Sequence, residues 1–246
     1  MIPVDILVFA ALRRELRGFL RRKSANLRRV DARTWMGIFG PHQAVFCITG
    51  VGAEAARFAS EKIMARFKAS FVVSVGFAGG LAPGLATGTL VVARETGVIG
   101  ADGFRPSGNG RITDEVRKIL ARGFSAVHEG RLVSVSAPVF TPANKASLRE
   151  SAGADAVDME SAALAGLMKE CGIPFAAVRA VLDETGDDLS RLGAAWRRYG
   201  PFPARRMGLL RAVLADPGLV PVLWGLRKKE RIAAEILGRF IEDLVT

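Results

Sequence analysis

The chain has 246 residues, of which 50% are hydrophobic, so it is long enough to bury the core of one large domain. Its only two cysteines, Cys47 and Cys171, exclude a disulfide framework and indicate a reducing compartment such as the cytoplasm. Asp5 interrupts the apolar N-terminal run, which is not typical of a secretory signal, and no apolar stretch approaches the roughly 20 residues of a membrane-spanning helix.

The net charge of +11 is concentrated at the two ends of the chain. Residues 1–33 hold nine Lys/Arg and three Asp/Glu, and residues 190–246 hold eleven and five, so each end carries +6. Residues 34–189 hold fifteen and sixteen, which is a net charge of −1. Two interpretations stay open: the basic ends are solvated helix faces, or they form a surface for anionic lipid or nucleic acid.

Strands alternate with helices along most of the chain. Mostly apolar runs predict strands at 2–9, 34–39, 44–49, 71–76, 90–98, 131–136 and 175–182. Apolar residues at helical spacing predict helices at 12–22, 53–67, 113–122 with Thr113 as N-cap, from 144 onward and around 162–168, and glycines favour a loop over 101–110. This alternation indicates an α/β fold with a central mixed sheet flanked by helices.

The composition changes after Asp188. Residues 189–226 combine four prolines with aromatic side chains and many arginines, a pattern that predicts several short amphipathic helices. A final helix is predicted over 230–245. We therefore divide the chain into an α/β domain over 1–188 and a basic amphipathic helical extension over 189–246 that completes the same domain.

Carboxylates gather in the segment 156–188. Asp158 and Glu160 come at the start of a predicted helix, and Asp183 ends the buried strand that follows. Ligands of open α/β sheets bind outside the carboxyl ends of the strands. The segment therefore predicts that these side chains converge on one small molecule.

Glycines in two loops offer a second kind of ligand contact. The sequence from Gly50 to Ala55 fits the G-x-G-x-x-A form of a dinucleotide-binding loop. The following strand ends at Gly76 without an acidic residue for a ribose hydroxyl, which argues against a nicotinamide enzyme. We instead expect backbone N–H groups at Gly52 and at 76–80 to approach a hydroxyl, a phosphate or a water.

Four motifs in order together resemble one family. They are ALRREL at 11–16, TGVG at 49–52, VGFAGGL at 75–81 with Gly88 shortly after, and VDMES at 157–161 with RAVLD at 179–183. Over about residues 2–188 they resemble the superfamily of purine nucleoside phosphorylases and methylthioadenosine/adenosylhomocysteine nucleosidases. The basic, Trp-containing extension resembles the branch called hopanoid-associated phosphorylases, which implies release of adenine from adenosylhopane in hopanoid biosynthesis.

The resemblance implies a role for each matching residue in breaking the N-glycosidic bond through an oxocarbenium-like ribosyl cation. Asp183 would protonate the adenine, which requires a raised pKa, and Glu15 would activate water. The remaining implied roles are ribose binding by Glu160 and Met159, base binding by Phe140, Phe77, Ala78 and Gly79, and phosphate or water binding by Arg13, Gly52 and Gly76. Structural interpretations compete with these: a capping acid at Asp183, a first-turn acid at Glu160, a core aromatic at Phe140 and a basic helix face at Arg13 and Arg14.

Three positions depart from the family pattern. Ser74 stands where hexameric phosphorylases carry a phosphate-binding arginine, and Phe77 and Leu182 stand where serine is common. The departures leave phosphorolysis and hydrolysis open, and they make the expected pocket more apolar. The resemblance implies no cofactor, with inorganic phosphate or water as co-substrate.

The sequence excludes other chemistries and leaves two rival functions. His42 and His128, the only histidines, have no ligand-type neighbours at metal-binding spacing, so we expect no metal, and no G-x-S-x-G motif is present. The rivals are a methylthioadenosine/adenosylhomocysteine nucleosidase and a non-catalytic, membrane-associated nucleoside-lipid binding protein. We expect a cytoplasmic homo-oligomer, a dimer by resemblance, that binds no nucleic acid. Peripheral association with the anionic inner face of the membrane stays one of the two open interpretations of the basic ends.

Overall fold

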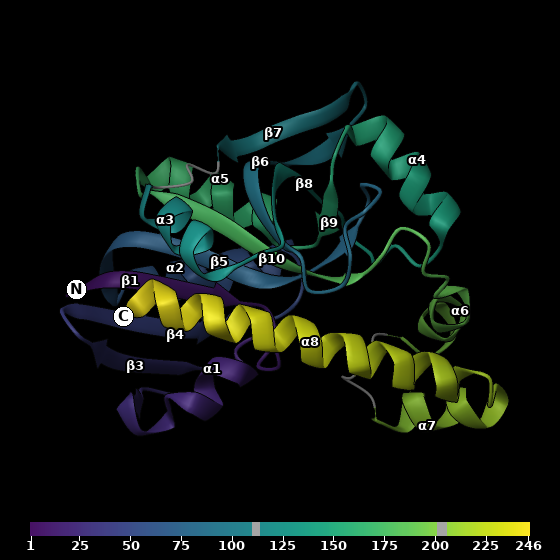
Figure 1. The fold of residues 1–246 in the computed structure, drawn as a ribbon, viewed down its shortest axis with the longest axis horizontal. Helices are drawn as coiled ribbons and strands as arrows, with labels where there is room; N and C mark the ends of the chain where they lie inside the picture. Colours follow the sequence, from purple (N-terminus) through teal and green to yellow (C-terminus); the bar gives the residue numbers. More distant parts are fainter. Residues whose placement is uncertain (110–113, 201–205) are drawn as a thin grey trace.

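The computed structural model describes residues 1–109, 114–200 and 206–246, and over these ten strands form one sheet with helices on both sides (Figure 1). The strands are β1 (Ile2–Ala10), β2 (Leu27–Arg29), β3 (Thr34–Phe39), β4 (His42–Ile48), β5 (Phe67–Gly80), β6 (Leu90–Gly100), β7 (Gly103–Asn109), β8 (Val127–Ser134), β9 (Ala156–Asp158) and β10 (Phe175–Asp183). The helices are α1 (Arg17–Arg22), η1 (Ser24–Asn26), α2 (Ala53–Met64), α3 (Asp114–Gly123), α4 (Pro142–Ala152), α5 (Ser161–Cys171), α6 (Ser190–Tyr199), α7 (Arg206–Ala215) and α8 (Leu219–Val245).

Part of the sheet closes on itself. Strand β5 pairs with both β10 and β9, and β6 and β8 complete a ring of five strands between them. From β5 the sheet continues through β1, β4, β3 and β2 to an open edge. Strands β1, β5 and β10 run parallel, so their carboxyl ends meet on one side, whereas β6 and β9 run antiparallel to β10 and β5. The predicted mixed α/β sheet is confirmed.

Two predicted elements differ in the structure because of backbone pairing that composition does not reveal. The expected loop over 101–110 is largely strand β7, which forms a hairpin with β6 and turns at Gly103, where φ is +97°. Gly97 permits this pairing, because a Cβ there would lie 2.3 Å from the carbonyl oxygen of Arg105. The expected helix over 12–22 begins only at Arg17, and the residues before it form turns. The expected N-cap at Thr113 lies outside the described residues.

The C-terminal extension contains one long helix where short ones are predicted. Helix α8 runs without a break for 27 residues, although Pro221 is expected to end a helix. Pro221 lies in the first turn, where backbone N–H groups have no intrahelical partner, so its missing donor costs little. Figure 1 shows α8 running along one side of the sheet and continuing past it beside α7. None of the described helices is both long enough and apolar enough to cross a bilayer.

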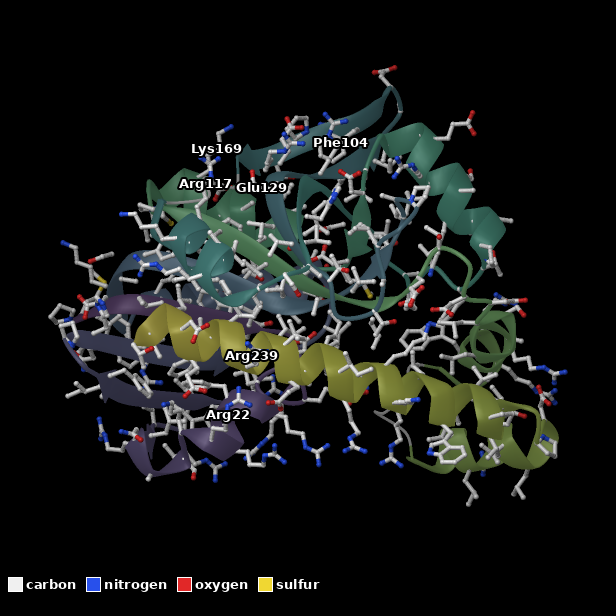
Figure 2. The ribbon with its side chains drawn as sticks, in the orientation of Figure 1. Arg22, Phe104, Arg117, Glu129, Lys169 and Arg239 are labelled. Carbon is white, nitrogen blue, oxygen red and sulfur yellow. The ribbon has the colours of Figure 1, made fainter. Side chains whose placement is uncertain are left out.

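The C-terminal half of α8 is part of the core. Helices α2 and α5 cover one face of the sheet, and α1 and α8 cover the other. Helices α1 and α8 meet at glycines, since a Cβ on Gly18 would lie 2.7 Å from the carbonyl oxygen of Ala234. Arg22, labelled in Figure 2, comes from α1 and donates to Glu242 on α8 at 2.9 Å. The extension therefore packs into the same body as residues 1–188.

We predict that truncating the inner face of α8 destabilises the whole fold. Leu237 is fully buried against the sheet, so Leu237→Ala should lower the free energy of unfolding by about 2–5 kcal/mol, measured by urea denaturation. Ile232→Ala, at an exposed position of the same helix, is the control and should cost well below about 1.5 kcal/mol. If Leu237→Ala lowered the free energy of unfolding no more than Ile232→Ala, the prediction would be contradicted.

Candidate active site

Glu15 lies buried at the carboxyl ends of β1 and β5. Its Oε2 accepts the backbone N–H of Leu12 at 2.7 Å, and its Oε1 accepts that of Phe77 at 3.1 Å. Gly76 permits this approach, because a Cβ there would lie 3.0 Å from Oε1. Burial raises the pKa of Glu15, although both N–H groups favour the ionised form and oppose the rise. The structure thus brings the predicted Glu15 and Gly76 together.

Arg179 lies beside Ser74 and Gly76 of β5 and is almost completely buried. Its Nε donates to Asp158 Oδ2 at 2.9 Å, and Nη1 donates to the carbonyl oxygens of Ser74 and Val178. Its Nη2 donates to the hydroxyls of Ser74 and Ser161, each at 2.7 Å. A guanidinium has five N–H donors, and the protein uses all of them. Arg179 is therefore a fixed buried cation with no donor left for a ligand.

Asp158 is the partner of that cation and not a ligand-facing group. Its Oδ1 accepts the Ser134 hydroxyl at 2.5 Å, and its Oδ2 accepts the backbone N–H and the hydroxyl of Ser161 in addition to Arg179. The expectation that Asp158 converges with Glu160 on a ligand is therefore wrong. Its side chain points into the protein, because a buried guanidinium requires a buried counter-charge.

Glu160 joins the beginnings of two helices. It occupies the N-cap position of α5, and its Oε1 accepts the backbone N–H of Gly52, the N-cap of α2, at 2.7 Å. Gly52 has a φ of +93°, a conformation that favours glycine. Burial, followed by the nearby charge of Asp158, raises the pKa of Glu160 to about 7. Within the described part of the chain only Oε1 is bound, so Oε2 is available to a ligand.

Asp183 ends β10 beside Gly79 of β5. A Cβ on Gly79 would lie 3.4 Å from Asp183 Oδ2, so glycine leaves this carboxylate accessible from the strand. Lys145 of α4, which is 1% exposed, ion-pairs with Asp183 Oδ2 at 2.5 Å and donates to the carbonyl oxygen of Glu184. Burial raises the pKa of Asp183, and the charge of Lys145 acts in the opposite direction.

Sequence analysis misses Lys145. A signal exists: the residue lies in the first turns of α4, after the N-cap Thr141 and Pro142, where the helix dipole disfavours a cation. A lysine there needs a carboxylate partner from elsewhere in the fold. That partner lies 38 residues further along the chain, so only the tertiary structure identifies it as Asp183.

Two of the three carboxylates, Glu15 and Asp183, lie beside one stretch of β5. Glu15 contacts this strand at Gly76 and Phe77, and Asp183 faces it at Gly79. Three residues of extended strand span roughly 10 Å, which separates these two acids along the strand. Glu160 lies at the start of α5, and the charge of Glu15 contributes, as the smallest of several causes, to its raised pKa. A small molecule that lay along this stretch of β5 would therefore meet Glu15 at one end and Asp183 at the other.

The other predicted site residues have mixed surroundings. Met159 and Phe77 are half-buried, and Ala78 is buried in the core under α2 and α5. Phe140 packs against α6, with its ring centroid 6.1 Å from that of Trp196. Arg13 is exposed, and its guanidinium lies over the Trp35 ring at 5.1 Å. Base stacking by Phe140 and phosphate binding by Arg13 stay predictions.

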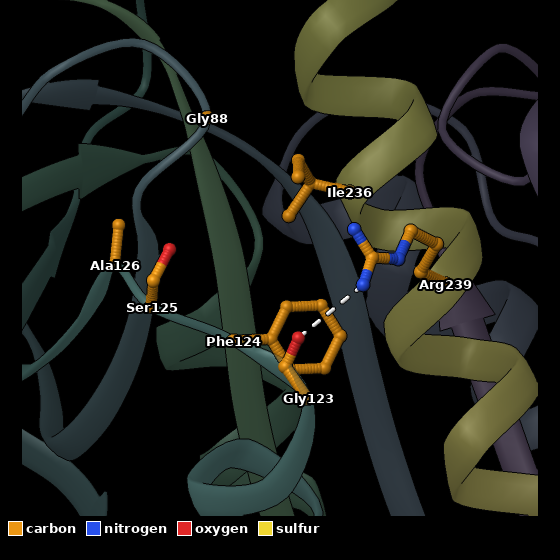
Figure 3. A pocket seen from close by; sticks show the side chains of 7 residues that line it. All are labelled: Gly88, Gly123, Phe124, Ser125, Ala126, Ile236 and Arg239. Carbon is orange, nitrogen blue, oxygen red and sulfur yellow. Dashed lines mark hydrogen bonds between the residues drawn. The ribbon is translucent and has the colours of Figure 1, made fainter.

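A separate pocket lies between α8 and the loop that follows α3 (Figure 3). It is lined by Gly88, Gly123, Phe124, Ser125, Ala126, Ile236 and Arg239. Arg239 donates to the carbonyl oxygen of Gly123 at 3.3 Å and lies over the Phe124 ring. This pocket has none of the three carboxylates, so we do not assign it to the active site. Among the described residues, no three His, Cys, Asp or Glu side chains gather in a way that could hold a metal ion.

Most of this chain is similar to known proteins. Residues 5–198 match the family described as the phosphorylase superfamily. A 5'-methylthioadenosine/S-adenosylhomocysteine nucleosidase of Actinobacillus succinogenes is 28% identical over 173 residues, which cover 64% of this chain and 74% of that protein. The structure of a nucleosidase of the same name from Helicobacter pylori is similar over 100% of this chain and 99% of its own, with a TM-score of 0.75 and 17% identity. Futalosine hydrolase from Helicobacter pylori matches 98% of this chain and 97% of its own, with a TM-score of 0.74 and 16% identity.

We predict that Glu160 makes the stability of the fold depend on pH. Its folded pKa of about 7 lies above the ordinary 4.5, so the folded state holds the proton more tightly than the unfolded chain. The free energy of unfolding should therefore fall as pH rises between these two values, by up to about 3 kcal/mol. Glu160→Gln cannot ionise, so its stability relative to the native protein should increase from about pH 5 to about pH 8 in urea denaturation.

The matched control for this measurement is Glu54→Gln, an exposed glutamate in the first turn of α2. Its stability difference from the native protein should stay flat over the same pH range. Parallel pH curves for Glu160→Gln and the native protein would contradict the prediction.

Proposed function

The chain belongs to the phosphorylase superfamily, and on that premise we propose that it is a nucleosidase, an enzyme that hydrolyses the N-glycosidic bond between ribose and a purine. The observation that carries the proposal is a set of three largely buried carboxylates, with Glu15 and Asp183 beside β5 and Glu160 at the start of α5. The departure of a base from a sugar requires one group that supplies a proton and another that is negative, and a set of carboxyls in different surroundings can provide both.

Asp183 is the proposed acid. A purine leaves readily only when its ring nitrogen N7 is protonated, so the acid must hold a proton near neutral pH. Burial raises the pKa of Asp183 in this direction. Lys145 holds Oδ2, which leaves Oδ1 to face the base, and Gly79 leaves room beside the carboxyl. As the glycosidic bond breaks, the proton passes from Asp183 to N7 and the bonding electrons stay on the base.

Glu160 and Glu15 are the proposed groups on the sugar side. Ionised Glu160 would accept hydrogen bonds from ribose hydroxyls through Oε2, with Met159 packing against the sugar. Glu15 would take a proton from the water that attacks the anomeric carbon. Two negative charges near the ribosyl cation also stabilise the transition state electrostatically. Burial raises the pKa of both acids, which makes each ionised carboxylate a stronger base toward a ribose hydroxyl or a water.

Water is the proposed co-substrate, and no cofactor takes part. A phosphate ion needs cationic or N–H donors, and Arg179 has none left, because the protein occupies all five. Ser74, at the position of the phosphorylase arginine, is itself bound to Arg179. These contacts favour hydrolysis over phosphorolysis.

The proposed substrate is adenosylhopane, with adenine as the released base. Phe77 and Leu182 make the site more apolar than the family pattern, and an exposed apolar surface on α7 and α8 suits a lipid-borne nucleoside. The similarity to 5'-methylthioadenosine/S-adenosylhomocysteine nucleosidases favours a second candidate substrate, methylthioadenosine or adenosylhomocysteine. Comparing kcat/KM for adenosylhopane and methylthioadenosine decides between them.

A non-catalytic carrier has no need of three buried acids. We further propose a cytoplasmic homo-oligomer, a dimer, at the inner face of the membrane.

We predict that Asp183→Asn abolishes most adenine release. The amide retains an oxygen for Lys145 but has no proton to give to N7, so kcat should fall by about 10²–10⁴ in a continuous adenine assay. Asp188→Asn changes a nearby exposed acid that accepts the backbone N–H of Ser190 and should keep most activity. Near-native activity of the folded Asp183→Asn variant would remove Asp183 as the acid.

We also predict that adenine release does not depend on phosphate. Rates in buffers with and without inorganic phosphate should agree, and ¹⁸O-labelled water should place its label on the anomeric carbon of the sugar product. This follows from the absence of a free guanidinium donor at Arg179. Formation of a ribosyl 1-phosphate in phosphate buffer would show that the enzyme is a phosphorylase after all.

A further inference from the structure

The outer side of α7 and the start of α8 expose large apolar side chains. Leu210 and Leu214 on α7 are 54% and 73% exposed, and Val220 and Trp224 on α8 are 52% and 78% exposed. Each pair is one helical turn apart and so shares a helix face. The inner sides of the same helices pack around the buried Leu219. We call these four exposed residues the apolar tip, which lies where α7 and α8 extend past the sheet (Figure 1).

Exposed cations that form no ion pair with an acidic side chain of the described residues flank the apolar tip. Arg211, Arg227, Lys228 and Arg231 are exposed, and none forms an ion pair within the ranges that the structure describes. The acids of this segment are already neutralised. Asp216 pairs with Arg191 at 2.7 Å, and Glu230 pairs with Arg14 at 2.9 Å. The local charge around the apolar tip is therefore positive.

We propose that the apolar tip and its four cations form a docking surface for an anionic phospholipid bilayer. Exposed leucines and a tryptophan suit the boundary between lipid headgroups and acyl chains, and the adjacent cations match the negative lipid surface. A nucleic acid would be matched by the charge but not by four aliphatic and aromatic side chains in one exposed patch. The proposed function supplies only the reason for membrane binding, which is access to a lipid-borne substrate; the binding itself is inferred from the surface.

Contacts of Lys229 connect the helix that carries the docking surface to the segment beside the active site. Lys229, on the inner side of α8, ion-pairs with Asp187 and lies 3.7 Å from Glu184 Oε1. Glu184 directly follows Asp183, and its carbonyl oxygen accepts from Lys145. The same cluster around Leu219 includes Phe140 from the loop before α4. The bilayer surface would thus lie at the end of the molecule where β10 delivers the acid.

Flotation with lipid vesicles tests this surface on the full chain. The native protein should float with vesicles that contain phosphatidylglycerol and phosphatidylcholine and stay behind with phosphatidylcholine alone. The double variant Arg227→Glu with Lys228→Glu should bind at least about tenfold more weakly. The control is Lys118→Glu with Arg122→Glu, which makes the same charge change at exposed positions of α3 and should bind normally. Trp224→Ser should also weaken binding, through the lost apolar anchor.

Fluorescence gives an independent readout. Trp35 is buried and Trp196 is half-buried, so a blue shift of emission on adding anionic vesicles should come from Trp224 and vanish in Trp224→Phe. Absence of flotation by the native protein, or equal loss in the α3 control, would overturn the proposal. A change of oligomeric mass in Arg227→Glu with Lys228→Glu, with vesicle binding unchanged, would instead assign the surface to self-association. Failure of adenine release with vesicle binding intact would remove only the proposed function.

Discussion

The buried ion pair between Arg179 and Asp158 is the contact on which the rest of the site depends. It joins β10 to the end of β9, and the serines that complete it come from β5, β8 and α5. Breaking such a pair by removing one partner leaves an uncompensated charge in the core and costs on the order of 3–5 kcal/mol. Because the pair is complete, the segment between Asp158 and Ser161 has one conformation, and Glu160 is held where it meets α2.

The same contact explains the electrostatics of the acids around it. Arg179 shares its charge with Asp158 and donates to neutral groups with its remaining N–H groups, so it only partly offsets burial at Glu15 and Glu160. Burial then raises the pKa of both carboxyls. Asp183 differs, because Lys145 supplies it with a cation of its own. The three acids thus face different charges: Asp183 has a lysine of its own, whereas Glu15 and Glu160 feel the partly neutralised charge of Arg179.

Helix α8 connects this chemistry to the outside of the molecule. Its C-terminal half packs Leu237 and Phe240 into the core, and its N-terminal part presents Trp224 to solvent. Between the two, Lys229 contacts the segment that follows Asp183. A single helix therefore stabilises the sheet, positions the segment that follows Asp183 and carries the exposed apolar tip. Removing the extension to study its surface would also remove part of the core.

The sequence by itself determined the α/β class and most strands, because apolar periodicity is a local property. The segment 156–188 indicated Glu160 and Asp183 as candidate groups, and the resemblance to a family added Glu15 and the role of each. It did not show that 103–109 is a strand or that Pro221 lies inside a helix, since pairing partners and the position within a turn decide those. Only the tertiary structure decided that Asp158 faces Arg179, that Arg179 has no donor left, and that Lys145 meets Asp183. Each of these depends on which side chains distant in sequence share a buried, low-dielectric space, and no local pattern encodes that.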